Sequence, residues 1–135
     1  MAGSGPVLGV ISAGGALGAL ARWGLAVAVP AGGGFPWATF ATNVSGCLLI
    51  GVLMVLVHEV WPGRRLLRPF LGVGVLGGYT TFSTYAVDVV RLVDTGAWLT
   101  ALTYLTATVV VALAAVHAGT VAARWLVRRT GRRFR

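Results

Sequence analysis

A cluster of hydroxyl and aromatic side chains follows a pair of glycines in residues 77–85, which read Gly-Gly-Tyr-Thr-Thr-Phe-Ser-Thr-Tyr. Adjacent glycines accept backbone angles that a helix does not use. The segment lies in an apolar stretch, where backbone released from a helix is tolerated only if protein or a water-filled cavity satisfies it. The pattern therefore predicts a broken membrane helix with a binding site beside the break. The serine and threonine residues of the cluster are Thr80, Thr81, Ser83 and Thr84.

Two aromatic residues in this segment, Phe82 and Tyr85, stand three positions apart and so share one face of a helix. The simplest interpretation is ordinary aromatic packing. Their position directly after the break favours a second one, in which the rings line a site. An aromatic ring presents a positive edge, which suits an anion.

Other hydrogen-bond donors lie in the remaining apolar stretches. Asn43 must find a hydrogen-bond partner inside the membrane, either by joining two helices or by taking part in a binding site. Arg22 either extends to the membrane surface or faces protein or water inside it. Tyr104 and Thr108 stand one turn apart and with Thr100 form a possible polar stripe. Threonine in membrane helices often bonds its own i−4 carbonyl, which is the alternative for Thr108.

Acidic groups are scarce: Glu59, Asp88 and Asp94 are the only ones, and all lie near the ends of apolar stretches. A proton-coupled transporter usually needs a carboxylate deep in the membrane. No metal-ligand cluster, nucleophile–base pair or phosphate loop is recognisable, so we expect no enzyme. Hydrogen-bond donors without carboxylates that could accept a proton are typical of a site through which an anion moves passively.

The elements that position these residues are membrane helices. The chain has 135 residues, 57% hydrophobic and only 10% charged, which predicts one integral membrane domain spanning residues 1–135. Four spans are long enough to cross a bilayer, and the fold class is all-α. Tryptophans mark their ends. The expected spans are residues 6–29, 37–57, 66–90, which is broken near 77–81, and 97–123, followed by a basic tail at about 124–135.

Three segments together match a known family. They are residues 14–22 (Gly-Gly-Ala-Leu-Gly-Ala-Leu-Ala-Arg), residues 43–46 (Asn-Val-Ser-Gly) and residues 77–85. In motif order, spacing and four-span length, the chain resembles the Fluc (CrcB) family of bacterial fluoride channels along nearly its whole length. The resemblance implies passive export of fluoride from the cytoplasm across the bacterial plasma membrane.

The resemblance also implies an assembly and a set of site residues. The assembly is an antiparallel, dual-topology dimer with two pores and a central sodium ion that is structural and not transported. Backbone carbonyls of Gly77 and Thr80 from each subunit would hold that ion. The implied pore residues are Asn43, the aromatic pair Phe82 and Tyr85, and a polar track of Ser83, Thr84, Tyr104 and Thr108, with Arg22 and Asp88 in the vestibule.

The chain departs from the family pattern at three positions. Tyr85 replaces the usual second phenylalanine, which adds a hydroxyl. Asp88 stands where a glutamate is usual, and Ala112 leaves the lower polar track without a hydroxyl. These departures concern the Tyr85 side of the pore.

Two other functions fit parts of the sequence. A small proton-coupled multidrug exporter would need a glutamate in the first span, and none is there. A non-transporting assembly protein would explain Gly14 and Gly18, which permit close helix approach, but not the Thr-Thr-Phe-Ser-Thr cluster. For the basic tail, anionic lipid headgroups are the expected partner rather than nucleic acid.

Arginines are unequally divided between the two expected sides of the membrane. Arg64, Arg65 and Arg68 connect spans two and three, and six more arginines follow residue 123. With Arg22 set aside because it lies within span one, the opposite side has Arg91 alone. Basic residues favour the cytoplasmic side, so this bias predicts one preferred orientation with both termini in the cytoplasm. The functional partner would then be an oppositely inserted homologue. The alternative is dual insertion and a dimer of the chain with itself. The tail arginines extend beyond the last span, and charges this close to the C-terminus need not decide the orientation.

Overall fold

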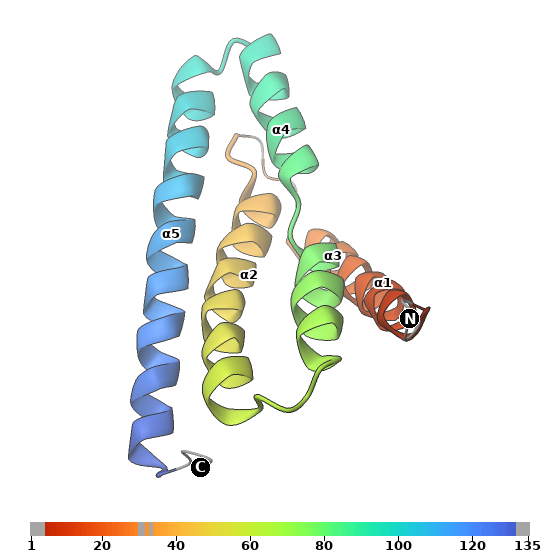
Figure 1. Ribbon diagram of the computed structural model, residues 1–135. Coiled ribbons are helices and arrows are strands. Elements are labelled where there is room, and N and C mark those ends of the chain that lie inside the picture. The colour runs from red at the N-terminus through yellow and green to blue at the C-terminus, as the bar shows by residue number, and fades with distance from the viewer. Residues whose placement is uncertain (1–4, 30–31, 33, 132–135) are drawn as a thin grey trace.

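The structure is a computed structural model that describes residues 5–29, 32 and 34–131. The described part is helical without strands, which confirms the predicted all-α class (Figure 1). Among the described residues, three helices are long and apolar enough to cross a membrane, at Gly5–Ala28, Trp37–Val60 and Trp98–Arg129. The elements are α1 (Gly5–Ala28), α2 (Trp37–Val55), the π-helical segments η1 (Leu56–Val60) and η2 (Arg68–Leu76), α3 (Gly77–Tyr79), α4 (Phe82–Asp94) and α5 (Trp98–Arg129).

The third predicted span is divided in two, as expected, but the glycines do not make the break. Gly77 has helical angles, with φ −66° and ψ −35°, and α3 continues η2 as far as Tyr79. Thr80 (ψ 155°) and Thr81 (φ −147°, ψ 119°) are extended, and α4 begins at Phe82. The prediction that Gly77-Gly78 supplies the non-helical backbone is therefore wrong. Gly78 serves close packing instead, because a Cβ there would collide with the carbonyl oxygen of Gly15.

Glycines also bring α1 against η2. Gly14 and Gly18 are buried, and a Cβ on either would collide with backbone, namely the carbonyl oxygens of Phe70 and Val75. Small residues of this kind let membrane helices approach closely, so that van der Waals contact holds them together. Packing is therefore the role that the structure gives to the Gly14–Gly18 pair. In Figure 1, α1 is strongly inclined to the other helices.

The second and last helices form the main pair. α2 and α5 run side by side in the same direction (Figure 1), and buried Gly51 and Gly119 bring their backbones close together. At one end of this pair, Val55, Val60, Ala123 and Val127 form a buried cluster. At the other end, α4 and α5 enclose a second cluster. Its buried members are Tyr85, Leu92, Ala101 and Tyr104.

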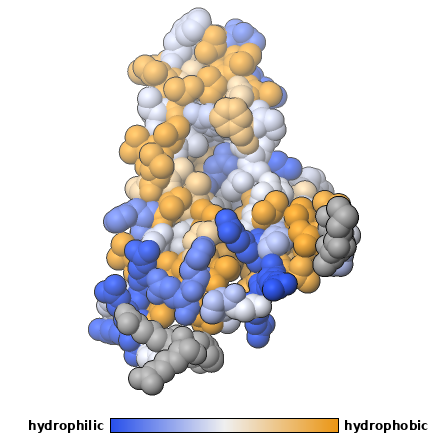
Figure 2. Space-filling view, in the orientation of Figure 1, coloured by the Kyte–Doolittle hydropathy of each residue, from blue (hydrophilic) through white to orange (hydrophobic). Residues whose placement is uncertain are grey.

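On the face that Figure 2 shows, hydrophobic residues cover much of the surface, and hydrophilic residues gather mainly in the lower half of the view. Many leucines, valines and tryptophans are exposed, which is the surface that a lipid environment requires. Helix α5 continues to Arg129, beyond the expected span end at residue 123, so the first basic residues of the expected tail are helical. The guanidinium of Arg129 stacks 3.9 Å from the ring centre of Trp125.

Candidate ion pathway

A groove of about 360 Å³ runs between the break and α5. It collects Asn43, Phe82, Tyr85 and Thr108, four of the residues predicted for the pore, from three separate elements. Its remaining wall is mostly apolar. The other residues that line it are Cys47, Thr80, Thr81, Val109, Ala112, Leu113 and Val116.

The two aromatic residues of the groove are held in different ways. Their ring centres lie 5.8 Å apart. Phe82 is 80% exposed, so packing within this chain does not explain its position. Tyr85 is only 8% exposed, and its hydroxyl donates a hydrogen bond of 2.8 Å to the Leu105 carbonyl of α5. The hydroxyl that departs from the family pattern is therefore engaged by the neighbouring helix, while the ring still lines the groove.

Asn43 forms two hydrogen bonds with the backbone of one residue in the break, Thr81. Its Nδ2 donates to the Thr81 carbonyl at 2.9 Å, and its Oδ1 accepts from the Thr81 N–H at 2.8 Å. The predicted hydrogen bonding between helices is thus present, and Asn43 lines the groove as well. An asparagine amide has two N–H groups, so one remains for a further acceptor.

Tyr104 and Thr108 are buried, and their hydroxyls have partners within the chain. Thr108 Oγ1 donates to the Tyr104 carbonyl at 2.6 Å, the own-helix bond that was the alternative to a polar stripe. Tyr104 has no exposed surface, and it is not among the residues that line the groove. Its hydroxyl lies 3.4 Å from Asp88 Oδ2, and its ring packs 5.2 Å from that of Tyr85.

Thr84 and Arg22 lie on a separate surface of the chain. They line a second depression of about 280 Å³, together with Thr39, Thr42 and Thr81. Ser83 is exposed, with its Oγ 3.3 Å from the Thr81 hydroxyl. Within one chain, the predicted polar track is therefore divided between two surfaces. A half-buried arginine beside threonine hydroxyls is a suitable surface for attracting an anion.

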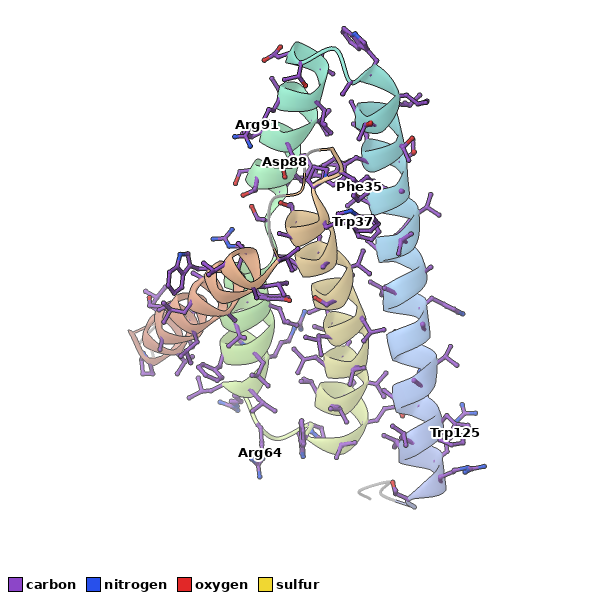
Figure 3. All side chains as sticks on the ribbon, turned by 180° about the vertical axis from the view of Figure 1, so that it is seen from behind. Phe35, Trp37, Arg64, Asp88, Arg91 and Trp125 are labelled. Atoms are coloured by element: carbon purple, nitrogen blue, oxygen red, sulfur yellow. The ribbon has the colours of Figure 1, made fainter. Side chains whose placement is uncertain are left out.

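Asp88 lines a third depression, of about 350 Å³, with Phe35, Trp37, Thr39 and Arg91. Figure 3 shows Phe35, Trp37, Asp88 and Arg91 in the opposite half of the molecule from Arg64 and Trp125. Asp88 Oδ2 accepts a hydrogen bond of 2.8 Å from Thr39. No sequence pattern pointed to Thr39, because it lies 49 positions from Asp88 and no local motif joins the two residues.

The carbonyls predicted to hold a cation have lost their helical donors. In a continuous helix the Thr81 N–H would bond the Gly77 carbonyl and the Thr84 N–H the Thr80 carbonyl. The Thr81 N–H donates instead to Asn43 Oδ1, and the Thr84 N–H donates to Thr81 Oγ1 at 3.1 Å. Gly77 is exposed, and a Cβ there would come no closer than 3.9 Å to the Gly72 carbonyl. Carbonyl oxygens released in this way are the ligands that a hard cation takes.

Comparison with known proteins agrees with this geometry. Residues 9–120 match the family model described as CrcB-like protein, Camphor Resistance (CrcB). The chain is 58% identical over 120 residues to "Fluoride-specific ion channel FluC 2" of Nocardia farcinica, covering 88% of this chain and 86% of that protein.

Two Streptomyces proteins are similar as well. Identity is 57% over 107 residues to "Fluoride-specific ion channel FluC 2" of Streptomyces avermitilis, covering 78% of this chain and 68% of that protein. It is 51% over 125 residues to "Fluoride-specific ion channel FluC 1" of Streptomyces coelicolor, covering 92% and 79%. The predictions of the family and of a protein that is not an enzyme are confirmed, and the chain belongs to the CrcB-like family of ion channels.

Proposed function

We propose that this chain is a fluoride-specific channel that lets fluoride leave the bacterial cytoplasm passively. The observation that carries the proposal is the groove beside the broken span, where Asn43, Phe82, Tyr85 and Thr108 meet. Membership of a family whose similar members are named fluoride-specific channels supports the choice of ion.

The chemistry of the groove suits a small, tightly hydrated anion. A pore for such an ion must replace its water at several closely spaced positions. The ring edges of Phe82 and Tyr85 carry partial positive charge, and Asn43 keeps one N–H that the break does not use. On the second surface, Arg22 would raise the local concentration of anions. The electrochemical gradient of fluoride alone then drives its movement through the pore. Hydrogen fluoride that crosses the lipid ionises inside, so the net direction is outward.

The functional unit in this proposal is an antiparallel dimer. The groove is open along one side, and Phe82 and Gly77 are both exposed in the single chain. A second, inverted chain would cover this side and create two pores. The carbonyls of Gly77 and Thr80 from both chains would then bind a structural sodium ion at the centre, because a hard cation needs more oxygen ligands than one chain presents here.

Fluoride efflux from liposomes that contain only this purified chain tests the function. Loaded vesicles should release fluoride when an ionophore balances the charge, whereas vesicles loaded with chloride should not. Protein-free vesicles are the control. Absence of fluoride release from vesicles that contain correctly assembled protein would contradict the proposal.

A further inference from the structure

The extended backbone of the break is bonded by a side chain from α2 and not by its own helix. Asn43 accepts from the N–H and donates to the carbonyl of the same residue, Thr81, at 2.8 and 2.9 Å. A β-strand neighbour exchanges the same two bonds with a residue opposite it. The amide thereby satisfies both backbone groups of a residue that lies between two helices, where lipid offers them no partner.

Helix α2 also accommodates the two residues before Thr81. A Cβ at Gly46 would collide with the methyl group of Thr80, so the missing side chain makes room for the break. The Ser45 hydroxyl lies 2.9 Å from the Tyr79 hydroxyl. Three successive residues of the third span therefore contact the segment 43–46. The glycines of the third span do not cause the break, and this segment of α2 is the element positioned to stabilise it.

The pair of hydrogen bonds between Asn43 and Thr81 has a consequence for the Gly77 carbonyl. The Thr81 N–H is the group that would close the helical bond to Gly77, and Asn43 captures it. We propose that Asn43 is a positioning residue whose amide holds the third span open and keeps the Gly77 carbonyl free for a cation. This role is separate from any contact between Asn43 and the ion in the groove. Its second part rests on the proposed sodium site.

The first test measures the break itself, without sodium binding or fluoride flux. Asn43→Leu keeps the shape of the side chain and removes both hydrogen bonds, and Asn43→Ala is the smaller second variant. Thr42→Val is the matched control, because Thr42 Oγ1 donates to the Ala38 carbonyl of its own helix. Amide hydrogen exchange at Thr81 and carbon chemical shifts of Thr80 and Thr81 are measured by nuclear magnetic resonance in detergent micelles.

Exchange at Thr81 should be about tenfold faster or more in both Asn43 variants and unchanged in Thr42→Val, because a net hydrogen bond is lost. Slow exchange combined with helical carbon shifts would equally support the role, since the span would then have closed without Asn43. Slow exchange with extended carbon shifts, as in the wild type, would overturn the proposal.

The second test measures assembly as sodium is titrated against a large organic cation. The sodium concentration at half-maximal dimer should rise about tenfold or more in Asn43→Leu and stay within about twofold in Thr42→Val. A wild-type midpoint in Asn43→Leu, with reduced flux, would make Asn43 a pore contact only and overturn its positioning role. If wild-type assembly does not depend on sodium, the proposed sodium site fails, and exchange at Thr81 still decides whether Asn43 holds the break.

Discussion

Phe82 and Tyr85 share one groove but have opposite exposure. Phe82 is 80% exposed and Tyr85 is 8% exposed. A large aromatic side chain left this open in a single chain serves a ligand, a partner or lipid. The position of Phe82 beside Asn43 and the break favours the first two. The residue is therefore a sharper probe of the pathway than Tyr85, whose removal would also disturb the packing of α4 on α5.

Replacement of Phe82 by isoleucine should reduce fluoride flux about tenfold or more, equivalent to about 1.4 kcal/mol in the barrier to permeation. Isoleucine keeps an apolar side chain of similar bulk but has no positive ring edge. Leu99→Ile is the control, because Leu99 is equally exposed on α5 and does not line the groove. Flux is measured in liposomes and dimer content by light scattering. Wild-type flux in Phe82→Ile would assign Phe82 to packing.

Replacement of Tyr85 by phenylalanine should leave flux within about twofold while lowering stability by about 1 kcal/mol, the net value of one hydrogen bond. The bond lost is the one to the Leu105 carbonyl, which joins α4 to α5. Thermal unfolding of the purified protein is compared with flux. A large loss of flux without loss of stability would show that the Tyr85 hydroxyl acts on the ion.

At the scale of the helices, packing depends on glycines that lie against backbone. Gly18 of α1 faces the Val75 carbonyl in η2, where a collision with a methyl group cannot be relieved by turning a side chain. Gly24 of the same helix has open space around it. The two positions therefore separate the effect of close contact from the effect of helix propensity.

Alanine at Gly18 should destabilise the protein by about 1–3 kcal/mol or more, the range found when a packed interior is overfilled. Alanine at Gly24 should be neutral or stabilise α1 by about 0.5–1 kcal/mol, because glycine is a poor helix former. Thermal unfolding of both variants is the measurement. Equal stability of the two variants would mean that the contact between α1 and η2 contributes little.

The sequence predicted the all-α fold, the three long apolar helices and the division of the third expected span, but it misjudged the cause of the break. Local rules assign non-helical backbone to glycine, whereas Thr80 and Thr81 leave the helix because Asn43, 38 positions before Thr81, bonds the backbone there. The N-cap role of Thr81, which accepts from the Thr84 N–H, was open to prediction from residue type alone. The partners Asn43–Thr81, Thr39–Asp88 and Tyr85–Leu105 were not, since only tertiary packing brings them together.

For the whole molecule, sodium should determine assembly. If Gly77 and Thr80 carbonyls from two chains share one ion, exhaustive replacement of sodium by a large organic cation should dissociate the dimer and stop flux together. Readdition of sodium should restore both. The measurements are light scattering and fluoride release on the same preparation. If assembly and flux stayed unchanged after sodium had been fully replaced by the organic cation, sodium would not be a structural component of the channel.

Orientation in the membrane follows from charge at the two ends of the bundle. The connection from η1 to η2 and the end of α5 lie at the same end in Figure 1, and Arg124 forms an ion pair of 3.4 Å with Glu59 there. Arg64 and Trp125 mark this end in Figure 3, and Arg91 lies toward the other. The sequence places Arg64, Arg65, Arg68 and the six arginines after residue 123 on the first side. With Arg22 set aside because it lies within α1, the second side has Arg91 alone.

Such a bias should fix the chain with both termini in the cytoplasm, because arginines close to span ends resist translocation. A cysteine placed in a C-terminal tag should then react only with membrane-permeant reagents in intact cells, in a background that carries Cys47→Ser. Since an antiparallel dimer needs an inverted partner, cells that express this chain alone should then export little fluoride, and coexpression with an oppositely inserted homologue should restore export. The purified chain in detergent has no fixed orientation, so it can still pair with itself in the liposome assay. Equal labelling from both sides, together with strong export from cells that express this chain alone, would instead establish dual insertion and a dimer of the chain with itself.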